Sequence, residues 1–285
     1  MHKNIVLGIS STQLTEKEKN LLKEHNPYGI ILFKRNCDAE DQVKKLNHSI
    51  KDILPNSKIF IDQEGGRVAR LKQPNFLEFP AANKLNSKEV IYDNYFIMGK
   101  YLHSLGIDIN CAPVADLYYA EADNIIGDRS FGETPDQVAD FVLAASEALM
   151  DSKITPIIKH IPGHGRALVD SHLELPIVST DLLTLEKTDF HVFKKLNHLP
   201  MAMTAHIIYT ALDPLLPVTI SRKSIDYIRQ KIGFNGLIIG DDLNMKALKG
   251  NLGELVKQTL EAGCDLALHC SGIFEEMEEV ISAID

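Results

Sequence analysis

Residues 154–165 read Ile-Thr-Pro-Ile-Ile-Lys-His-Ile-Pro-Gly-His-Gly, an apolar run that passes directly into polar residues and glycines. The apolar part, Ile154–Lys159, is short and almost continuously hydrophobic, which is typical of a parallel strand buried on both faces. The charged side chains that follow are costly to bury in a core. The stretch therefore indicates a buried strand whose carboxyl end carries functional groups.

Similar apolar runs recur along the chain, and each is followed by a longer amphipathic segment. The predicted strands are Ile5–Ile9, Gly29–Phe33, Ile59–Asp62, Ile109–Val114, Ile154–Lys159, Met201–His206, Gly236–Gly240 and Cys264–His269. The predicted helices are Thr15–His25, Ala39–Ile50, Ser87–Leu105, Pro135–Met150, Ser179–Leu196, Ser221–Lys231, Leu252–Ala262 and Ile273–Ile284. Thr134-Pro135 and Ser221 supply capping residues at two of the helix starts. Eight such units are the number that closes a (β/α)8 barrel of the TIM type, whereas periodicity alone also permits an open doubly wound sheet.

Length and composition favour one soluble domain. The 285 residues suit a single barrel of roughly 250 residues, and without a linker we expect one domain over residues 1–285, acting as a monomer. The formal charge of −9, from 30 Lys+Arg and 39 Asp+Glu, argues against nucleic acid or an anionic membrane as partner. No signal peptide or membrane-spanning run is evident, which predicts a cytoplasmic protein. The scattered Cys37, Cys111, Cys264 and Cys270 form no CxxC pair and are expected to be reduced thiols.

Polar residues collect at the ends of five predicted strands. The segments are Asp62–Arg70, Asp116 with Gly127–Gly132, Lys159–Gly165, Thr204–His206 and Gly240–Asp242. In a barrel the carboxyl ends of the strands converge on one pocket. We therefore expect these segments to form one site although they are far apart in the sequence.

Asp241 is the sharpest candidate for a catalytic group. A carboxylate at a buried strand end can attack an anomeric carbon and form a covalent glycosyl intermediate. The alternative is that Asp241 or Asp242 caps the following helix. The two residues need not share a role, because one can face the pocket while the other turns outward.

The segment from Lys159 to His172 carries His160, His164, Asp170 and His172 on non-helical backbone. In extended backbone Asp170 and His172 project to the same side, and a carboxylate bonded to an imidazole orients the ring for proton transfer. The glycines between residues 163 and 165 are expected to let the loop move over a substrate. The alternatives are a metal site, for which compact ligand spacing is missing, and a polar surface loop.

The remaining polar residues suit a sugar. Asp62 could accept hydrogen bonds from paired hydroxyls while Arg67, Arg70, Arg129 or Lys159 donates to them, although each arginine alone could be a surface ion-pairing residue. The chain has no Trp, so a long stacking cleft for polysaccharide is not expected. A pocket for one terminal sugar is expected instead.

Six segments together carry a family resemblance. They are Asp62–Arg70 (DQEGGRVAR), Gly127–Gly132 (GDRSFG), Lys159–Gly165 (KHIPGHG), Asp170–His172 (DSH), Met203–Tyr209 (MTAHIIY) and Gly240–Met245 (GDDLNM). In this order they resemble glycoside hydrolase family 3, and in particular its bacterial β-N-acetylglucosaminidases. The resemblance spans about the middle two-thirds of the chain.

The resemblance implies a retaining exo-hydrolase that removes a non-reducing terminal β-linked N-acetylglucosamine. It makes Asp241 the nucleophile, His172 the acid/base and Asp170 the group that orients His172. It assigns sugar binding to Asp62, Arg70, Arg129, Lys159 and His160, with His206 and Arg67 as further residues lining the site. It implies no metal or organic cofactor. The implied substrate is N-acetylglucosaminyl-1,6-anhydro-N-acetylmuramic acid, with or without a stem peptide, in peptidoglycan recycling.

Two positions depart from the family pattern. Gly240 replaces the small hydroxyl residue usual before the nucleophile and is expected to hold Asp241 less firmly, and Ile161 replaces an aromatic residue. The chain also ends soon after the eighth helix, as expected for the compact, single-domain type. The alternatives are a β-glucosidase or broader exo-glycosidase, a phosphorylase that uses phosphate as acceptor, and a catalytically silent sugar-binding barrel.

Overall fold

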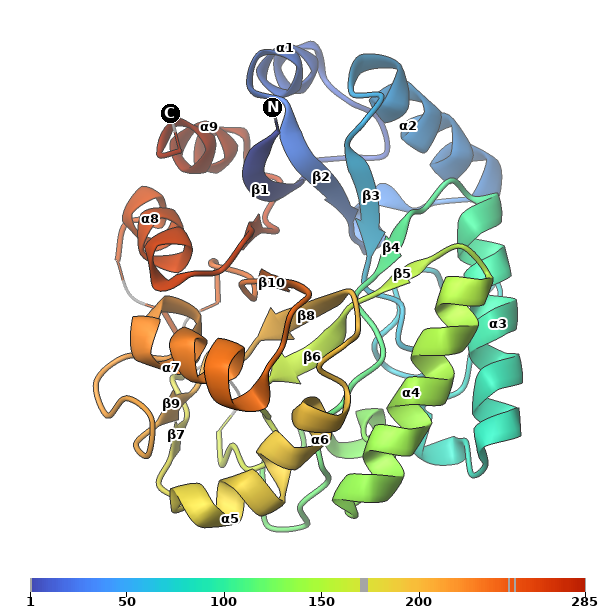
Figure 1. Cartoon of the computed structure of the whole chain (residues 1–285). Helices are drawn as coiled ribbons and strands as arrows, with labels where there is room; N and C mark the ends of the chain where they lie inside the picture. Colours follow the sequence, from blue (N-terminus) through green and yellow to red (C-terminus); the bar gives the residue numbers. More distant parts are fainter. Residues whose placement is uncertain (1, 170–173, 246, 249, 285) are drawn as a thin grey trace.

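A ring of parallel strands surrounded by helices forms the centre of the molecule (Figure 1). The computed structural model describes residues 2–169, 174–245, 247–248 and 250–284. The strands of the ring are β1 (Lys3–Gly8), β2 (Pro27–Leu32), β3 (Lys58–Ile61), β4 (Ile109–Asn110), β5 (Thr155–Pro156), β6 (Ile158–Ile161), β8 (Met201–Thr204), β10 (Leu237–Ile239) and β11 (Ala267–His269). The helices are α1 (Glu16–His25), α2 (Glu40–Ile53), α3 (Lys88–Ser104), α4 (Pro135–Asp151), α5 (Leu182–Lys187), α6 (Asp189–Lys195), α7 (Arg222–Tyr227), α8 (Leu252–Ala262) and α9 (Phe274–Ser282).

Two sheets and two single bridges make up the ring. One sheet has the order β11-β1-β2-β3-β4-β5 and the other has the order β10-β8-β6. Parallel bridges join them, Val114 with Lys159 and Ile239 with Leu266. Because β5 and β6 are the two halves of one predicted strand, the described residues place eight parallel segments around the ring. The predicted (β/α)8 architecture is confirmed, and the open doubly wound sheet is excluded.

Several local predictions differ from the structure. The helix predicted over Ser179–Leu196 is two helices, α5 and α6, that meet at Thr188. The helix predicted over Ser221–Lys231 is α7 followed by a π-helical turn, η5 (Ile228–Ile232). Ser221 caps α7 as expected by accepting from the Ser224 N–H at 3.2 Å, whereas Thr134 makes no side-chain cap to α4. A short ladder of β7 (Ile177–Val178) with β9 (Ile208–Tyr209) was not predicted, because two residues show no periodicity.

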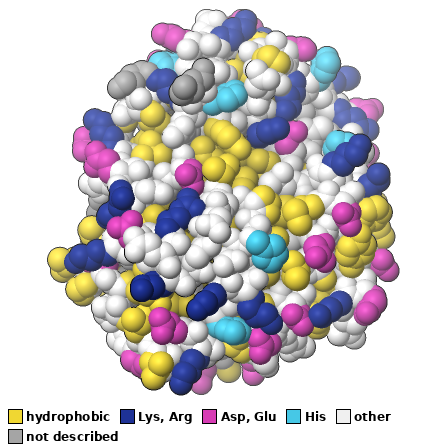
Figure 2. Space-filling model, in the orientation of Figure 1, with side chains coloured by type: hydrophobic (Ala, Val, Ile, Leu, Met, Phe, Trp, Pro, Cys, Tyr) yellow, Lys and Arg dark blue, Asp and Glu magenta, His cyan; other side chains and the backbone are white. Residues whose placement is uncertain are grey.

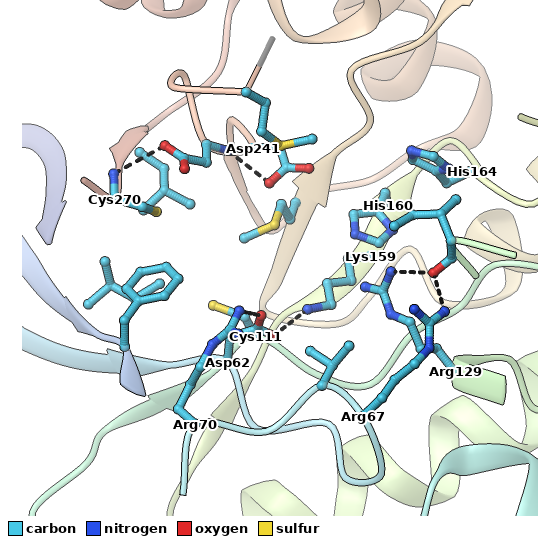
Figure 3. A pocket seen from close by; sticks show the side chains of 18 residues that line it. Asp62, Arg67, Arg70, Cys111, Arg129, Lys159, His160, His164, Asp241 and Cys270 are labelled. Atoms are coloured by element: carbon cyan, nitrogen blue, oxygen red, sulfur yellow. Dashed lines mark hydrogen bonds and ion pairs between the residues drawn. The ribbon is translucent and has the colours of Figure 1, made fainter. Parts of the chain in front are cut away.

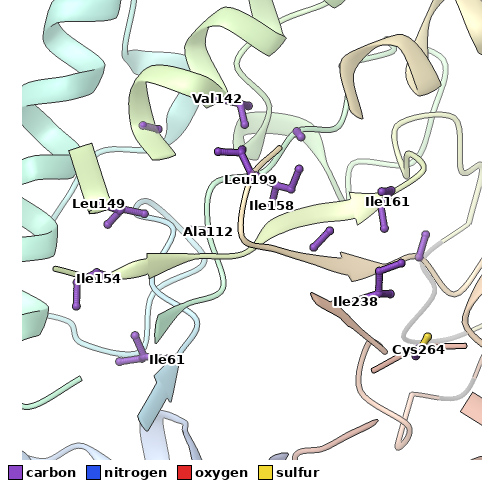
Figure 4. Close-up of a cluster of buried hydrophobic side chains, with 14 of the residues drawn as sticks. Ile61, Ala112, Val142, Leu149, Ile154, Ile158, Ile161, Leu199, Ile238 and Cys264 are labelled. Atoms are coloured by element: carbon purple, nitrogen blue, oxygen red, sulfur yellow. The ribbon is translucent and has the colours of Figure 1, made fainter. Parts of the chain in front are cut away.

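Both faces of the ring strands are buried, which explains their unbroken hydrophobicity. Successive side chains of a strand point to opposite faces. One set fills the inside of the ring, namely Val6, Ile31, Phe60, Ile109, Cys111, Ile157, Met201, Met203, Ile239, Leu266, Leu268 and Cys270. Their sequence neighbours pack outward against the helices, as Ile158 of β6 does close to Val142 of α4 and Leu199 (Figure 4).

The surface and the thiols agree with the composition. On the face shown in Figure 2, cationic and anionic side chains are interspersed and no large area has one sign. No helix in the described ranges combines the length and the apolar character needed to cross a bilayer. Cys111, Cys264 and Cys270 are free and buried, as predicted for core thiols, and Cys37 is free and partly exposed.

Replacing Ile158 by Ala tests the packing between β6 and the helices. Ile158 is fully buried, and truncation of such a side chain typically costs about 2–5 kcal/mol. We expect the free energy of unfolding, measured by urea denaturation, to fall by that amount. Leu215→Ala is the control, because the side chain of Leu215 is 79% exposed and its loss is expected to change the free energy by less than about 0.5 kcal/mol. Equal effects of the two substitutions would contradict the packing described.

Candidate active site

A cavity of about 230 Å³ opens among the carboxyl ends of the ring strands (Figure 3). Drug-sized ligands typically occupy pockets of roughly 300–1,000 Å³, so this cavity suits a smaller molecule such as a single sugar. Its lining consists of Ile31, Phe33, Asp62, Arg67, Val68, Arg70, Cys111, Ile125, Arg129, Lys159, His160, His164, Met203, Asp241, Asp242, Met245, Leu268 and Cys270. All the predicted sugar-binding residues except His206 are among them.

The strand pleat explains why three charged groups reach this cavity. Side chains two residues apart on a strand share a face. The inward-facing Phe60, Ile157 and Ile239 are followed two residues later by Asp62, Lys159 and Asp241. The charged groups therefore continue the inner face of the ring beyond its apolar filling. In Figure 3 Asp241 lies across the cavity from Asp62, Arg70 and Lys159.

Asp62 binds two cations at once. Its Oδ1 lies 2.5 Å from Nζ of Lys159, and its Oδ2 accepts from the guanidinium of Arg70. Burial favours a higher pKa for Asp62, but the two cations hold its pKa well below the ordinary value. Burial disfavours the charged form of Lys159, but Asp62 and Glu64 raise its pKa. Asp62 and Lys159 are therefore both ionised at neutral pH.

Glu64 lies behind the cavity and was not singled out from the sequence. It accepts from Nε and from a terminal nitrogen of Arg129 at 2.8 Å each, and its Oε1 lies 2.6 Å from Nζ of Lys159. Against the effect of burial, the charges of Arg129 and Lys159 lower the pKa of Glu64. Glu64 thus holds two cavity cations in place, a role that its position two residues after Asp62 on the same strand extension could have suggested.

Asp116 performs a similar task for the histidines. Its fully buried carboxylate accepts from the backbone N–H groups of His160 and His164 and lies 2.7 Å from Nδ1 of His160. Burial and the nearby imidazole lower the pKa of His164 to about 4, so this ring is neutral at pH 7. The sequence placed Asp116 at a strand end without giving it a role. The structure makes it the residue that orients His160.

Asp241 and its neighbour Asp242 differ in environment. Burial favours a higher pKa for Asp241, but nearby His206 and His160 favour the charged form, and the net pKa is lowered. Burial and the Asp241 charge raise the pKa of Asp242 to about 6. The next helix, α8, begins at Leu252 with Asn251 as its N-cap, so neither aspartate is the helix cap considered as an alternative.

His206 was predicted to bind the sugar, yet it does not line the cavity. It is fully buried, with Nδ1 2.7 Å from the hydroxyl of Thr219 and Nε2 3.0 Å from the backbone carbonyl of Asp242. Side chains alternate between the two faces of a strand, and Met201 and Met203 of β8 face the inside of the ring. Thr204 and His206 therefore face away from it. His206 therefore contacts the site from behind, through the backbone next to Asp241.

The glycines before the predicted proton-transfer pair serve close packing. A Cβ on Gly165 would lie 2.0 Å from the carbonyl oxygen of Leu117, and a Cβ on Gly163 would lie 2.9 Å from Cβ of Asp189. The hydroxyl of Tyr209 also donates to the carbonyl of Gly163 at 2.8 Å. Asp170 and His172 themselves lie outside the described residues. Within the described ranges, no group of three or more His, Cys, Asp and Glu side chains is placed to hold a metal ion.

Comparison with known proteins decides the family. The sequence model described as "Glycosyl hydrolase family 3 N terminal domain" matches residues 3–285. The chain belongs to glycosyl hydrolase family 3. A curated relative, the "Beta-hexosaminidase" of Alkalilimnicola ehrlichii, is 35% identical over 282 residues, which cover 94% of this chain and 80% of that protein.

Solved family 3 structures share the fold over almost the whole chain. NagZ from Neisseria gonorrhoeae, in complex with N-trifluoroacetyl-D-glucosamine, superposes with a TM-score of 0.91 at 32% identity, covering 99% of this chain and 85% of that one. The family 3 β-N-acetylglucosaminidase from Paenibacillus sp. gives a TM-score of 0.93 at 31% identity. The matched region includes 99% of this chain but only 56% of the Paenibacillus protein.

The two departures from the family 3 pattern concern packing. A Cβ on Gly240 would lie 3.0 Å and 3.1 Å from the methyl groups of Thr259 and Thr219, so these methyl groups occupy the space that the missing side chain leaves. Gly240 is therefore backed by packed atoms, and the expected looser hold on Asp241 stays a prediction. Ile161 is fully buried on the outer face of β6, among the core residues and away from the cavity.

Glu64→Gln is predicted to destabilise this family 3 barrel. Removing one partner of a buried ion pair typically costs about 3–5 kcal/mol, and we expect the free energy of unfolding at pH 7 to fall by that amount. Folding lowers the pKa of Glu64, so ionised Glu64 adds to the free energy of unfolding of the wild type above the ordinary carboxyl pKa of about 4.3. This contribution is lost as the pH falls below that value. Urea denaturation between pH 7 and pH 3 measures both effects.

Glu254→Gln is the matched control for Glu64→Gln. Glu254 is 63% exposed in its side chain and lies 3.7 Å from Lys257. Surface pairs of this kind contribute about 0–1 kcal/mol. A Glu64→Gln effect no larger than that of Glu254→Gln, or a difference from wild type that does not narrow at low pH, would show that Glu64 does not hold the buried cations.

Proposed function

We propose that this chain is a retaining exo-β-N-acetylglucosaminidase that removes one non-reducing terminal N-acetylglucosamine through a covalent intermediate on Asp241. The observation that carries the proposal is the placement of Asp241. This carboxylate, with its lowered pKa, faces Asp62, Arg70 and Lys159 across a cavity of about 230 Å³. The names of the relatives and the N-acylglucosamine-bound family 3 structure support the choice of sugar.

The cluster of Asp62, Arg70 and Lys159 suits the hydroxyls of one pyranose. Asp62 supplies acceptor oxygens, and the two cations supply donors whose geometry is fixed by their pairing with Asp62. Glu64 holds Lys159 from behind and also pairs with Arg129, which lines the same cavity. Groups fixed before the substrate arrives lose little entropy on binding, which favours correct orientation of the anomeric carbon.

The proposed reaction has two steps. In the first, Asp241 attacks C1, the glycosidic bond breaks, and protonated His172 donates its proton to the leaving oxygen. In the second, neutral His172 removes a proton from water, which attacks C1 and releases Asp241 with net retention of configuration. Asp170 would orient His172. The lowered pKa of Asp241 supports its part, because only the ionised carboxylate is nucleophilic.

For the natural substrate we propose N-acetylglucosaminyl-1,6-anhydro-N-acetylmuramic acid, with or without its stem peptide, cleaved in the cytoplasm during peptidoglycan recycling. The cavity supports removal of a single terminal sugar, because its size leaves room for one ring. The resemblance of the six motifs to bacterial enzymes of this type supports the choice of aglycone. Incubation with purified anhydro-muropeptides, followed by chromatography of released N-acetylglucosamine, tests it.

Asp241→Asn is predicted to remove the nucleophile without changing the fold. We expect kcat with p-nitrophenyl N-acetylglucosaminide to fall by at least about 10³-fold, since loss of a nucleophile typically costs that much or more. The melting temperature should stay close to that of the wild type. Asp136→Asn, at a side chain that is 72% exposed, is the control and should retain full activity. A fully active Asp241→Asn protein would refute the nucleophile assignment.

The sugar specificity is predicted to favour the N-acetyl group. We expect kcat/KM for p-nitrophenyl N-acetylglucosaminide to exceed that for the corresponding glucoside by at least about tenfold, a modest difference in transition-state binding of about 1.4 kcal/mol. Preference for the glucoside would overturn the proposed specificity. The same assay in phosphate buffer shows whether sugar 1-phosphate is formed, which would reveal a phosphorylase.

A further inference from the structure

Three fully buried polar side chains lie behind Asp241, outside the cavity lining. They are Thr204 at the end of β8, His206 just beyond it, and Thr219 in the 3-10 turn η4 (Val218–Ile220). Buried polar groups of this kind are costly unless they are hydrogen-bonded. Their hydrogen bonds connect them to the backbone of Asp241 and Asp242, which indicates that they fix this segment together.

The bonds form a closed ring around the two aspartates. The N–H of Asp241 donates to the Thr204 hydroxyl at 3.3 Å, and the hydroxyls of Thr204 and Thr219 lie 2.7 Å apart. The Thr219 hydroxyl lies 2.7 Å from Nδ1 of His206, and Nε2 of His206 lies 3.0 Å from the carbonyl oxygen of Asp242. The N–H of Asp242 donates to Oδ1 of Asp241 at 2.8 Å and completes the ring.

The donors and acceptors of the ring are compatible with one another. The carbonyl of Asp242 can only accept, so Nε2 of His206 carries a proton. The contact between Nδ1 of His206 and the Thr219 hydroxyl forms whether or not Nδ1 carries a proton, because a hydroxyl both donates and accepts. The Thr219 hydroxyl also donates to the Ala205 carbonyl at 3.3 Å. Thr219 can accept from Thr204, whose own lone pair receives the Asp241 N–H. Every member is thereby satisfied, which is the condition under which a buried polar network fixes one geometry.

The side chain of Asp242 adds a second attachment. Its Oδ1 accepts from the N–H groups of Asn244 and Cys270 at 3.1 Å each, so the segment after β10 is tied to the end of β11. The ring ties the same segment to β8 and η4. Asp241 is therefore held from both neighbouring sides of the barrel, with Oδ1 already engaged by a backbone donor.

We propose that Thr204, Thr219 and His206 are positioning residues that set the orientation of the Asp241 carboxylate for attack. The proposal rests on the proposed function of Asp241 as nucleophile. None of the three lines the cavity, so they act through the backbone of residues 241 and 242. Gly240 lets Thr219 pack close to the strand end, because a Cβ at position 240 would lie 3.1 Å from the methyl group of Thr219.

Thr219→Val tests the ring because it keeps the shape of the side chain and removes only the hydroxyl. We expect kcat with p-nitrophenyl N-acetylglucosaminide to fall by about 10–100-fold, since small misplacement of a reacting group can cost about 10²-fold. KM should change by less than about twofold, because the sugar-binding groups are untouched. Thr219→Ser restores the hydroxyl and is expected to restore kcat.

Thr259→Val is the matched control. Thr259 is also fully buried and its methyl group also packs near Gly240, but its hydroxyl donates to the Leu255 carbonyl within α8. Both valine variants should lower the melting temperature, while only Thr219→Val should lower kcat. Equal kcat values in the two variants, with both proteins folded, would overturn the proposal. If Thr219→Val does not fold, Thr204→Val replaces it, and the same comparison decides.

Amide hydrogen exchange separates this inference from the proposed function. In peptides covering residues 237–245, exchange at the Asp241 amide should be faster in Thr219→Val than in wild type and unchanged in Thr259→Val. If the wild type hydrolyses no aryl glycoside, the proposed function fails. The exchange measurement then tests the hydrogen-bonded ring by itself. Exchange at Asp241 that is unchanged in Thr219→Val would overturn the ring whatever the activity.

Discussion

The ammonium group of Lys159 is the constraint on which the mouth of the barrel depends. The side chain is only 3% exposed, and a buried charge is tolerated only with close partners of opposite sign. Asp62 and Glu64 supply them at 2.5 and 2.6 Å, and the same two carboxylates bind Arg70 and Arg129. Asp241 faces this group across the cavity (Figure 3). The fixed charges around Lys159 therefore prepare a polar rim before any sugar is bound.

The pleat of the strands divides the chemistry into two layers. Inward-facing positions beyond the apolar filling carry Asp62, Lys159 and Asp241, the groups that we assign to binding and attack. The supporting groups do not line the cavity: Glu64 holds Lys159, Asp116 holds His160, and the hydrogen-bonded ring lies behind Asp241. Such supporting groups fix the orientation of those that touch a ligand. A change in the supporting layer is therefore expected to act indirectly, through the cavity group that the changed residue holds.

The same arrangement accounts for the two departures from the family pattern. Ile161 faces outward, where an aliphatic side chain fills the core as well as an aromatic one can. Gly240 also faces outward, and the methyl groups of Thr219 and Thr259 fill the space beside it. Neither position lines the cavity. Both departures therefore concern packing and not the groups around the cavity.

The sequence by itself determined the barrel and most of the charged residues that line its cavity. Unbroken apolar runs such as Ile154–Lys159 require burial on both faces, and polar residues after such runs can only collect at the strand ends. The six motifs further identified the family. These predictions depend on local sequence patterns, which can be recognised without knowledge of tertiary contacts.

Only the tertiary structure decided which polar residues face the cavity and which support it. Glu64 and Asp116 look like any other carboxylates in the sequence, and their roles depend on Arg129 and His160, which are far away along the chain. His206 was assigned to the site from the family resemblance and its place after a strand, but its contacts with Thr219 and Asp242 lie behind the cavity. Partners distant in sequence decide such roles, because hydrogen bonds depend on distances that the chain order does not contain.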